Sequence, residues 1–279
     1  MVIKLSEKSK RIPRSGIRKI FDIARKYENV ISFTLGEPDF QTPDHIKKAA
    51  YEAIEQGYTH YTPNAGLEDF REVVAEKLRR ENRIEVNPQT EVIATPGGMG
   101  GLCLAVYATV EDGDQVLTAD PGYVSYVSQI LMAGGEPVRV PVYEQNNFML
   151  TAEEVKKRIT PKTKAIILNY PANPTGSTLS KKDLEALCQV IMENDLVVIS
   201  DEVYERITYD GISHCSIASL TDMKDRVISI FSLSKTYAMT GWRIGYAAGN
   251  QDFIKEMTKL QEHVSAHPSA ISQKAAIAA

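Results

Sequence analysis

Apolar runs and amphipathic segments alternate along the chain. Near the amino end, apolar residues recur at three- and four-residue spacing between charged residues, which predicts helices over residues 17–27, 44–57 and 67–82. Further on, short apolar runs predict strands over residues 91–95, 115–119, 137–142, 164–169, 196–200, 227–231 and 243–249. The stretches between these runs predict helices over residues 101–110, 123–134, 151–159, 180–195 and 251–264.

This alternation predicts an α/β fold. Strands that are apolar along their length and are separated by amphipathic helices form mostly parallel sheets with helices on both faces. We therefore expect a three-layer α/β/α sandwich. Ligands of such folds bind beyond the carboxyl ends of the strands, so the residues that follow each strand are the first candidates for chemistry.

Polar and turn-forming residues follow five of the predicted strands. The segments are PGGMGG after residue 95, DPGY after residue 119, NYPANPTG after residue 168, DEVY after residue 200 and SLSK after residue 231. Because the carboxyl ends of parallel strands meet at one edge of a sheet, these segments are expected to lie close together. The sequence therefore predicts a ligand site at this edge.

Composition and charge narrow the class of ligand. The 279 residues are 43% hydrophobic and 24% charged, as in an ordinary globular domain or a domain with part of another. The net charge is −4 with both signs interspersed, which disfavours nucleic-acid and polybasic membrane partners. No apolar run approaches the ~20 residues of a membrane span, and the start lacks a signal-peptide core, which predicts a cytoplasmic protein. The expected partner is a small molecule.

Each motif has a structural and a functional interpretation. The turn at residues 96–101 joins a strand to a helix, where backbone N–H groups and the helix dipole favour a phosphate, although such turns also serve only as tight turns. Asn173 stands among turn formers, and Asp201 follows a buried strand, where a carboxylate needs a cationic or hydrogen-bonding partner. Tyr123 and Tyr204 are interior aromatic residues unless a ligand uses them.

Lys235 decides between these interpretations. A lysine directly after a buried strand is costly unless its nitrogen is used. An amine beside an anion-binding turn, an acid and aromatic residues can hold an aldehyde cofactor as a Schiff base, with the acid on a pyridinium nitrogen and Arg243 on a phosphate. His263 and His267 have metal-like spacing but no third ligand nearby, so no metal site is expected.

The ordered series of motifs resembles one enzyme family. The chain contains LGEPDF (35–40), YTPNAGLEDFRE (61–72), TPGGMGGL (95–102), DPGYVSY (120–126), NYPANPTG (169–176), SDEVYERITYDG (200–211) and SLSKTYAMTGWRIGY (232–246). In order and spacing this series resembles the class I aminotransferases, pyridoxal-phosphate enzymes of fold type I, from about Arg14 onward. Within the family it is most similar to the bacterial aspartate or aromatic aminotransferase branch.

The resemblance implies roles around the cofactor ring. Lys235 would form the Schiff base with pyridoxal 5'-phosphate, and Asp201 would pair with the pyridine nitrogen. Asn173 and Tyr204 would hydrogen-bond the ring hydroxyl oxygen, and Tyr123 would stack on the ring. The catalytic residues implied are thus Lys235, Asp201 and Tyr204.

The resemblance also implies a phosphate site and a second subunit. The groups expected on the phosphate are the backbone at Gly97, Gly98 and Met99, the hydroxyls of Ser232 and Ser234, and Arg243. Tyr61 would reach the phosphate of the other subunit, which implies a homodimer with shared active sites. Asn169 would line the pocket, and the substrate would contact the backbone at Gly36 together with Tyr123 and Asn173.

The implied reaction is transamination between an amino acid and a 2-oxo acid by a ping-pong mechanism. An amino acid would displace Lys235, whose free amine would remove the Cα proton as a general base. A keto acid would leave after hydrolysis, and a second keto acid would accept the amino group.

Two differences from the family pattern bear on this interpretation. Family members continue into a small domain with an arginine for the substrate carboxylate, whereas this sequence stops at QKAAIAA. We expect residues 1–43 to form an arm and part of the small domain and residues 44–279 the cofactor-binding large domain, with the C-terminal small domain absent from this chain. Met99 stands where relatives selective for aspartate carry a lysine, so aromatic and other neutral donors stay open.

Two alternatives stay open from the sequence. The same fold supports α,β-elimination, as in cysteine-sulfur lyases, and release of ammonia and pyruvate without a keto acid would identify it. The chain would otherwise be an inert pyridoxal-phosphate-binding fragment with a regulatory role.

Overall fold

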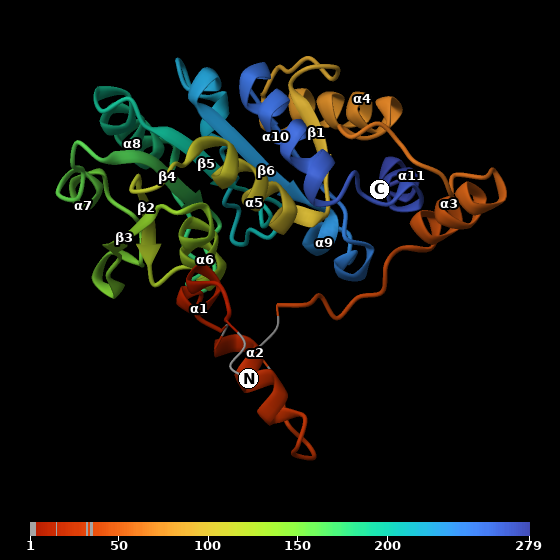
Figure 1. The fold of residues 1–279 in the computed structure, drawn as a ribbon, viewed down its shortest axis with the longest axis horizontal. Coiled ribbons are helices and arrows are strands. Elements are labelled where there is room, and N and C mark those ends of the chain that lie inside the picture. Colours follow the sequence, from red (N-terminus) through yellow and green to blue (C-terminus); the bar gives the residue numbers. More distant parts are fainter. Residues whose placement is uncertain (1–3, 15, 32, 34–35) are drawn as a thin grey trace.

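A seven-stranded sheet forms the centre of the molecule (Figure 1). The computed structural model describes residues 4–14, 16–31, 33 and 36–279, so Leu35 of the LGEPDF motif lies outside the described residues. The strands, in the order β1-β7-β6-β5-β4-β2-β3, are β1 (Val92–Thr95), β2 (Gln115–Asp120), β3 (Glu136–Pro141), β4 (Thr163–Asn169), β5 (Val197–Asp201), β6 (Val227–Ser232) and β7 (Gly245–Gly249).

The sheet is mostly parallel, as predicted. Pairing is parallel from β3 through β2, β4 and β5 to β6, whereas β7 is antiparallel to both β1 and β6. The reversal of β7 was not predictable from its apolar residues, because a buried strand has the same pattern in either direction.

Helices cover both faces of the sheet, which confirms the three-layer fold. One face carries α5 (Gly97–Thr109), α6 (Val124–Ala133) and α10 (Gln251–Val264). The other carries α7 (Ala152–Lys156) and α8 (Lys181–Glu193), with α3 (Asp44–Glu55), α4 (Glu68–Lys77) and α11 (Ala270–Ile277) packed near β1 and β7. The π-helical turn η1 (Leu78–Asn82) extends α4, and α9 (Leu233–Thr236) follows β6.

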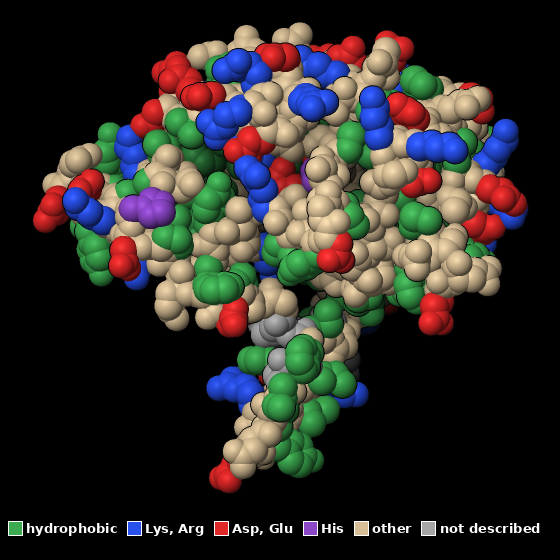
Figure 2. All heavy atoms as spheres, turned by 180° about the vertical axis from the view of Figure 1, so that it is seen from behind, with side chains coloured by type: hydrophobic (Ala, Val, Ile, Leu, Met, Phe, Trp, Pro, Cys, Tyr) green, Lys and Arg blue, Asp and Glu red, His purple; other side chains and the backbone are tan. Residues whose placement is uncertain are grey.

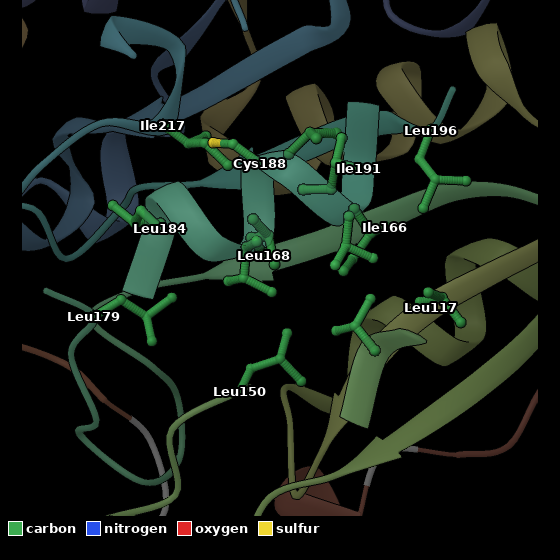
Figure 3. Packing of buried hydrophobic residues seen from close by; sticks show 14 of the residues in the cluster. Leu117, Leu150, Ile166, Leu168, Leu179, Leu184, Cys188, Ile191, Leu196 and Ile217 are labelled. Carbon is green, nitrogen blue, oxygen red and sulfur yellow. The ribbon is translucent and has the colours of Figure 1, made fainter. Parts of the chain in front are cut away.

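Alternate residues of each strand enter opposite cores. In β4, Ile166 and Leu168 face the core under α8, whereas Ala165 and Ile167 face the core under α5 and α6. Figure 3 shows Ile166 and Leu168 directed toward the buried side chains of α8, among them Leu184 and Ile191. Each such side chain contributes about 1.5–3 kcal/mol by burial, which fixes the register of the strands.

Two helices form an arm at the amino end. α1 (Glu7–Arg11) and α2 (Gly16–Ala24) project from the body in Figure 1, with a loose contact between Lys8 and Asp112 at 3.9 Å. Figure 2 shows apolar side chains along this projection, and Leu5, Ile20 and Tyr27 on it are largely exposed. Helix α1 of this arm packs against the body near α6, and the apolar side chains of α2 are left largely exposed among the described residues.

Two element boundaries differ from the predictions. Helix α5 begins at Gly97 rather than at residue 101, since its first turn is the Gly-rich segment itself. Strand β7 begins at Gly245 rather than at residue 243, because Arg243 has a left-handed backbone with φ 53° that cannot continue a strand. Among the described helices, none combines the length and apolar character needed to span a membrane.

Candidate active site

The predicted site residues gather at one edge of the sheet. The carboxyl ends of β1, β4, β5 and β6 lie there, and the reversal of β7 places its amino end beside them. The strand register pairs Asn169 with Asp201, and it pairs Gly245 with both Ser232 and Thr95. Residues from five strands therefore meet at this edge, as the positions after the strands predicted.

Asp201 is a buried carboxyl group at the end of β5. Its residue is 3% exposed, and the carboxylate accepts hydrogen bonds from the Tyr126 hydroxyl at 2.7 Å and the Val203 N–H at 3.3 Å. Burial raises its pKa from 3.8 to about 6, although both hydrogen bonds oppose this rise and the nearby Glu202 adds to it. No cationic side chain of the described residues forms an ion pair with it, so the site can accept a cationic group.

Two asparagines connect β4 to the loop after β5. The side-chain amide of Asn169 donates to the backbone carbonyl of Asp201 at 3.1 Å. Its side-chain oxygen Oδ1 accepts from the backbone N–H of Asn173 at 2.8 Å. The Asn173 side chain donates to the Tyr204 hydroxyl at 3.4 Å. Burial raises the pKa of Tyr204, and Asp201 contributes to the rise. These contacts hold a phenol and two amides in fixed positions beside Asp201.

Lys235 lies in the short helix α9 and points toward the same site. Its Nζ donates to the Gly36 carbonyl and lies 5.9 Å from the centre of the Tyr204 ring. Burial lowers the pKa of Lys235, Glu37 opposes this change and Arg243 contributes to it. The amine is therefore easier to deprotonate than an exposed lysine, as a nucleophile or general base requires.

The Gly-rich turn forms a close cradle at the start of α5. A Cβ on Gly97, whose φ is +70°, would lie 2.6 Å from Nη2 of Arg243, and one on Gly98 would lie 3.0 Å from Cγ1 of Val203. Only glycine leaves the backbone open here, and the free N–H groups of the first helical turn favour an anion. The neighbouring Ser232 hydroxyl accepts from the Ser234 N–H at 3.2 Å.

The remaining predicted residues lie around this centre. Tyr123 precedes α6 and packs edge-to-face on Tyr126, with ring centres 5.4 Å apart. Met99 is partly exposed, and its carbonyl accepts from Gln129 at 3.3 Å. Tyr123 thus lies beside Tyr126, which holds Asp201, and Met99 lies in the first turn of α5.

Tyr61 is not brought into the site of its own chain. It is 91% exposed, and its ring packs edge-to-face on His267 at 5.7 Å. Beside it lies an open cavity of about 1040 Å³ whose lining includes Glu37, Arg243 and His267. The exposed tyrosine and the cavity therefore adjoin on one surface.

Two buried residues of the site were not singled out from the sequence. Tyr126 holds Asp201, and its position three residues after Tyr123 on one helix face was an available signal. Glu202 is 1% exposed and pairs with His214, twelve residues later, across a loop whose sequence gives no signal of the contact.

Metal and disulfide chemistry find no support in the described part of the chain. His, Cys, Asp and Glu side chains form no metal-binding group among the residues that the structure describes. Cys103, Cys188 and Cys215 are free thiols.

Known proteins with similar sequences share this architecture. The family model for aminotransferase class I and II matches residues 28–279. The chain is 47% identical over 272 residues to an aspartate aminotransferase of Pyrococcus abyssi and 44% identical over 272 residues to aromatic-amino-acid aminotransferase 2 of Thermococcus litoralis. Both alignments cover 98% of this chain and 70% of the relative, so the chain spans about 70% of the length of these relatives.

Solved structures agree with these matches. A crystal structure of Pyrococcus protein-A1 superposes with a TM-score of 0.96 at 47% identity, covering 98% of this chain and 71% of the other. The aspartate aminotransferase from Thermus thermophilus with maleate superposes with a TM-score of 0.94 at 37% identity, covering 99% and 72%.

Proposed function

The chain belongs to the aminotransferases of class I and II, and from this premise we propose that it transfers an amino group from an amino acid to a 2-oxo acid with pyridoxal phosphate, using Lys235 as the attachment point and base. The observation that carries the assignment of residues is the buried Asp201 carboxyl, which has no cationic partner among the described residues and whose neighbour Tyr204 has its ring centre 5.9 Å from the Lys235 amine. A buried carboxyl without a cationic partner and a half-buried lysine with a lowered pKa are both costly unless a ligand uses them.

The residues present fit the cofactor. Asp201 offers a buried carboxylate to a pyridine nitrogen, and the cradle at Gly97 and Gly98 with Arg243 offers N–H groups and a positive charge to a phosphate. When bound, pyridoxal phosphate supplies an aldehyde that condenses with amines and a ring that withdraws electrons. The further residues proposed to hold it are Met99, Tyr123, Asn169, Asn173, Tyr204, Ser232 and Ser234.

The side chains around the proposed cofactor site have separate roles. Asp201 would keep the ring nitrogen protonated, because an ionised carboxylate in a buried site favours a cation beside it. Asn173 and Tyr204, already joined by a hydrogen bond, present an amide and a phenol to the ring hydroxyl oxygen. Tyr123 would stack on the ring. These contacts orient the reacting groups and exclude water from one side.

Lys235 moves the proton. Its lowered pKa leaves a larger fraction of Nζ unprotonated, so Nζ can take the proton from the substrate Cα and hold it for return. The Gly36 carbonyl accepts from Nζ, and we propose that the backbone at Gly36, together with Asn173, contacts the substrate.

The substrates are an amino acid and a 2-oxo acid. Which amino acid serves as the donor is a separate proposal. One relative is named for aspartate and another for aromatic amino acids. Met99 places no charge at the Gly-rich turn, which favours neutral donors alongside aspartate. Three of the four proteins compared above are named as aminotransferases and none is named as a lyase, so the elimination reaction has no support among them.

The proposed assembly is a homodimer with shared sites. The exposed Tyr61 and the cavity beside Arg243 adjoin on one surface, and a two-fold axis would bring each tyrosine to the other subunit's cavity. Within each subunit we propose an arm over residues 1–43 and a cofactor-binding domain over residues 44–279. The cytoplasmic location stays a prediction.

A half-reaction screen tests the function. The purified chain with pyridoxal phosphate is mixed with aspartate, tyrosine, phenylalanine or alanine, and conversion of the cofactor to its amine form is followed by absorbance. Conversion by one of these donors without ammonia release supports transamination, whereas ammonia and pyruvate without a keto acid would refute it. Lys235→Ala should lower the conversion rate about 10²–10⁴-fold, as expected on loss of a general base. Lys164→Ala, at the exposed start of β4, is the matched control and should convert normally.

A further inference from the structure

A buried carboxylate lies next to the site on the opposite face of the sheet. Glu202 follows Asp201 directly, and alternation along the strand directs its side chain away from the α5 face. Its Oε1 accepts from the Ser200 hydroxyl at 3.1 Å, and its Oε2 accepts from His214 Nε2 at 2.7 Å and from the Ser216 hydroxyl. A carboxylate that is 1% exposed requires such partners to stay ionised.

His214 supplies the positive charge of this cluster. Burial opposes its charging, but the hydrogen bond and charge of Glu202 outweigh burial and raise the pKa of His214 above its ordinary value. Glu205 adds to this rise, and Lys77, the other charge that faces the imidazole, opposes it. Glu202 in turn is held ionised, since His214, Ser216 and Ser200 together overcome its burial and lower its pKa.

The cluster fixes both ends of the loop that carries Tyr204. The Glu202 N–H donates to the Ile230 carbonyl at 2.9 Å, which attaches the start of the loop to β6. At the other end, the Ser216 hydroxyl accepts from Asn82 at 2.9 Å, and Asn82 also donates to Glu205 at 2.7 Å. Tyr204 lies between these anchors, so its position depends on them.

The cluster also determines the charge that the site experiences. An unpaired Glu202 carboxylate next to Asp201 would add a second negative charge in a region of low dielectric constant. A charged His214 at 2.7 Å cancels most of that field.

We propose that His214 is a positioning residue of the reaction: its imidazolium neutralises and anchors Glu202, so that the cofactor site experiences the charge of Asp201 alone and Tyr204 is held in place. This inference rests on the proposed function, in which Asp201 faces the cofactor ring.

Three variants separate charge from structure. His214→Gln keeps a hydrogen-bond donor toward Glu202 but removes the positive charge. Glu202→Gln removes the negative charge, so the group that raises the pKa of His214 is lost and His214 becomes neutral more easily. The double variant removes both charges and keeps the site neutral.

The measurement is the pH midpoint of the visible absorbance of the bound cofactor in each holoenzyme. In His214→Gln the uncompensated Glu202 charge favours the protonated form, so the midpoint should rise by about half a pH unit or more. In Glu202→Gln and in the double variant the midpoint should return to the wild-type value. An unshifted midpoint in His214→Gln, or an equal shift in the double variant, would overturn the inference.

A second measurement does not depend on whether the His214 and Glu202 variants fold. The chain has five histidines, and the imidazole titrations of the wild-type holoenzyme can be followed by NMR, with the His214 signal assigned by substituting the other four singly. Its midpoint should lie above the ordinary value of about 6.5. A midpoint at or below that value would contradict the ion pair. A wild type without a cofactor band would refute the proposed function, whereas a normal band with an unshifted His214→Gln variant would refute only the role of the pair.

Discussion

The Asp201 side of the site is closed, whereas the Arg243 side is open. Asp201, Asn169 and Ser234 are buried, and Asp201 and Asn169 are tied to one another by hydrogen bonds within the sheet edge. Arg243 and Tyr61 are exposed, and the cavity beside Arg243 opens to solvent. The closed side is therefore built by the chain alone, while the open side presents groups whose partners come from outside it.

The difference has a physical origin. Strand register places the closed-side residues, since Asn169 and Asp201 are paired across β4 and β5 and cannot shift without moving buried side chains. The open-side residues lie on loops, where fewer buried contacts determine position. Substitutions on the closed side should consequently lower catalysis, whereas substitutions on the open side should weaken cofactor binding.

The largest effect is expected on the closed side. Asp201→Asn keeps the shape but removes the charge that holds the ring nitrogen protonated, so kcat/KM for transamination should fall about 10²–10³-fold, the usual cost of one preorganised electrostatic group. Steady-state kinetics with a saturating cofactor measures this effect. Asp195→Asn, at an exposed carboxylate, is the control and should retain activity. Near-normal activity in Asp201→Asn would remove the basis for the assigned role.

The same closed-side carboxyl should make the cofactor-free protein sensitive to pH. The pKa of Asp201 is raised from 3.8 to about 6, so the folded state binds this proton more tightly than the unfolded state. The free energy of unfolding should therefore fall by up to about 3 kcal/mol as pH rises from about 4 to about 6. Urea unfolding across this range measures the fall. Asp201→Asn should lack the part of this fall that Asp201 causes. If the free energy of unfolding changed with pH in the same way in both proteins, the prediction would be wrong.

On the open side, Arg243→Ala should weaken the cofactor rather than the fold. Loss of a charged hydrogen bond to a phosphate costs about 1.5–3 kcal/mol, which corresponds to a roughly 10- to 150-fold higher Kd for pyridoxal phosphate. Equilibrium titration by absorbance or fluorescence measures the Kd, with unfolding temperature as the check on the fold. Arg80→Ala, at an exposed arginine on η1, serves as the control. An unchanged Kd would place the phosphate elsewhere.

The smallest effect is expected for Tyr61→Phe. If its hydroxyl reaches the partner subunit's cofactor, the cofactor Kd should rise about 2- to 10-fold, the net value of one hydrogen bond. The difference from wild type should vanish on dilution below the dimer dissociation constant, where Tyr61 has no site to reach. Tyr51→Phe, an exposed tyrosine on α3, is the control. A Tyr61 effect that persists in monomers would mean that the residue acts within its own chain.

Much of the closed side could be predicted from the sequence, and much of the open side could not. Apolar runs located all seven strands, and the rule that ligands bind at the carboxyl ends of strands predicted that Asn169, Asp201 and Lys235 lie at one edge. The pattern could not give the direction of β7 or the left-handed backbone of Arg243, because both depend on neighbouring strands rather than on local spacing. The Glu202–His214 pair was equally invisible, since it joins residues twelve apart through a loop without periodicity.

The reversal of β7 also bears on how such a site is inherited. Had β7 run parallel to β6, Arg243 would precede it at the far edge of the sheet, about 16 Å away along a five-residue strand. Because β7 is reversed, Lys235 and Arg243 stand eight residues apart and reach the same edge. The proposed covalent anchor and the proposed anion-binding cation are therefore encoded in one short contiguous segment, which recombination between related genes would transfer intact.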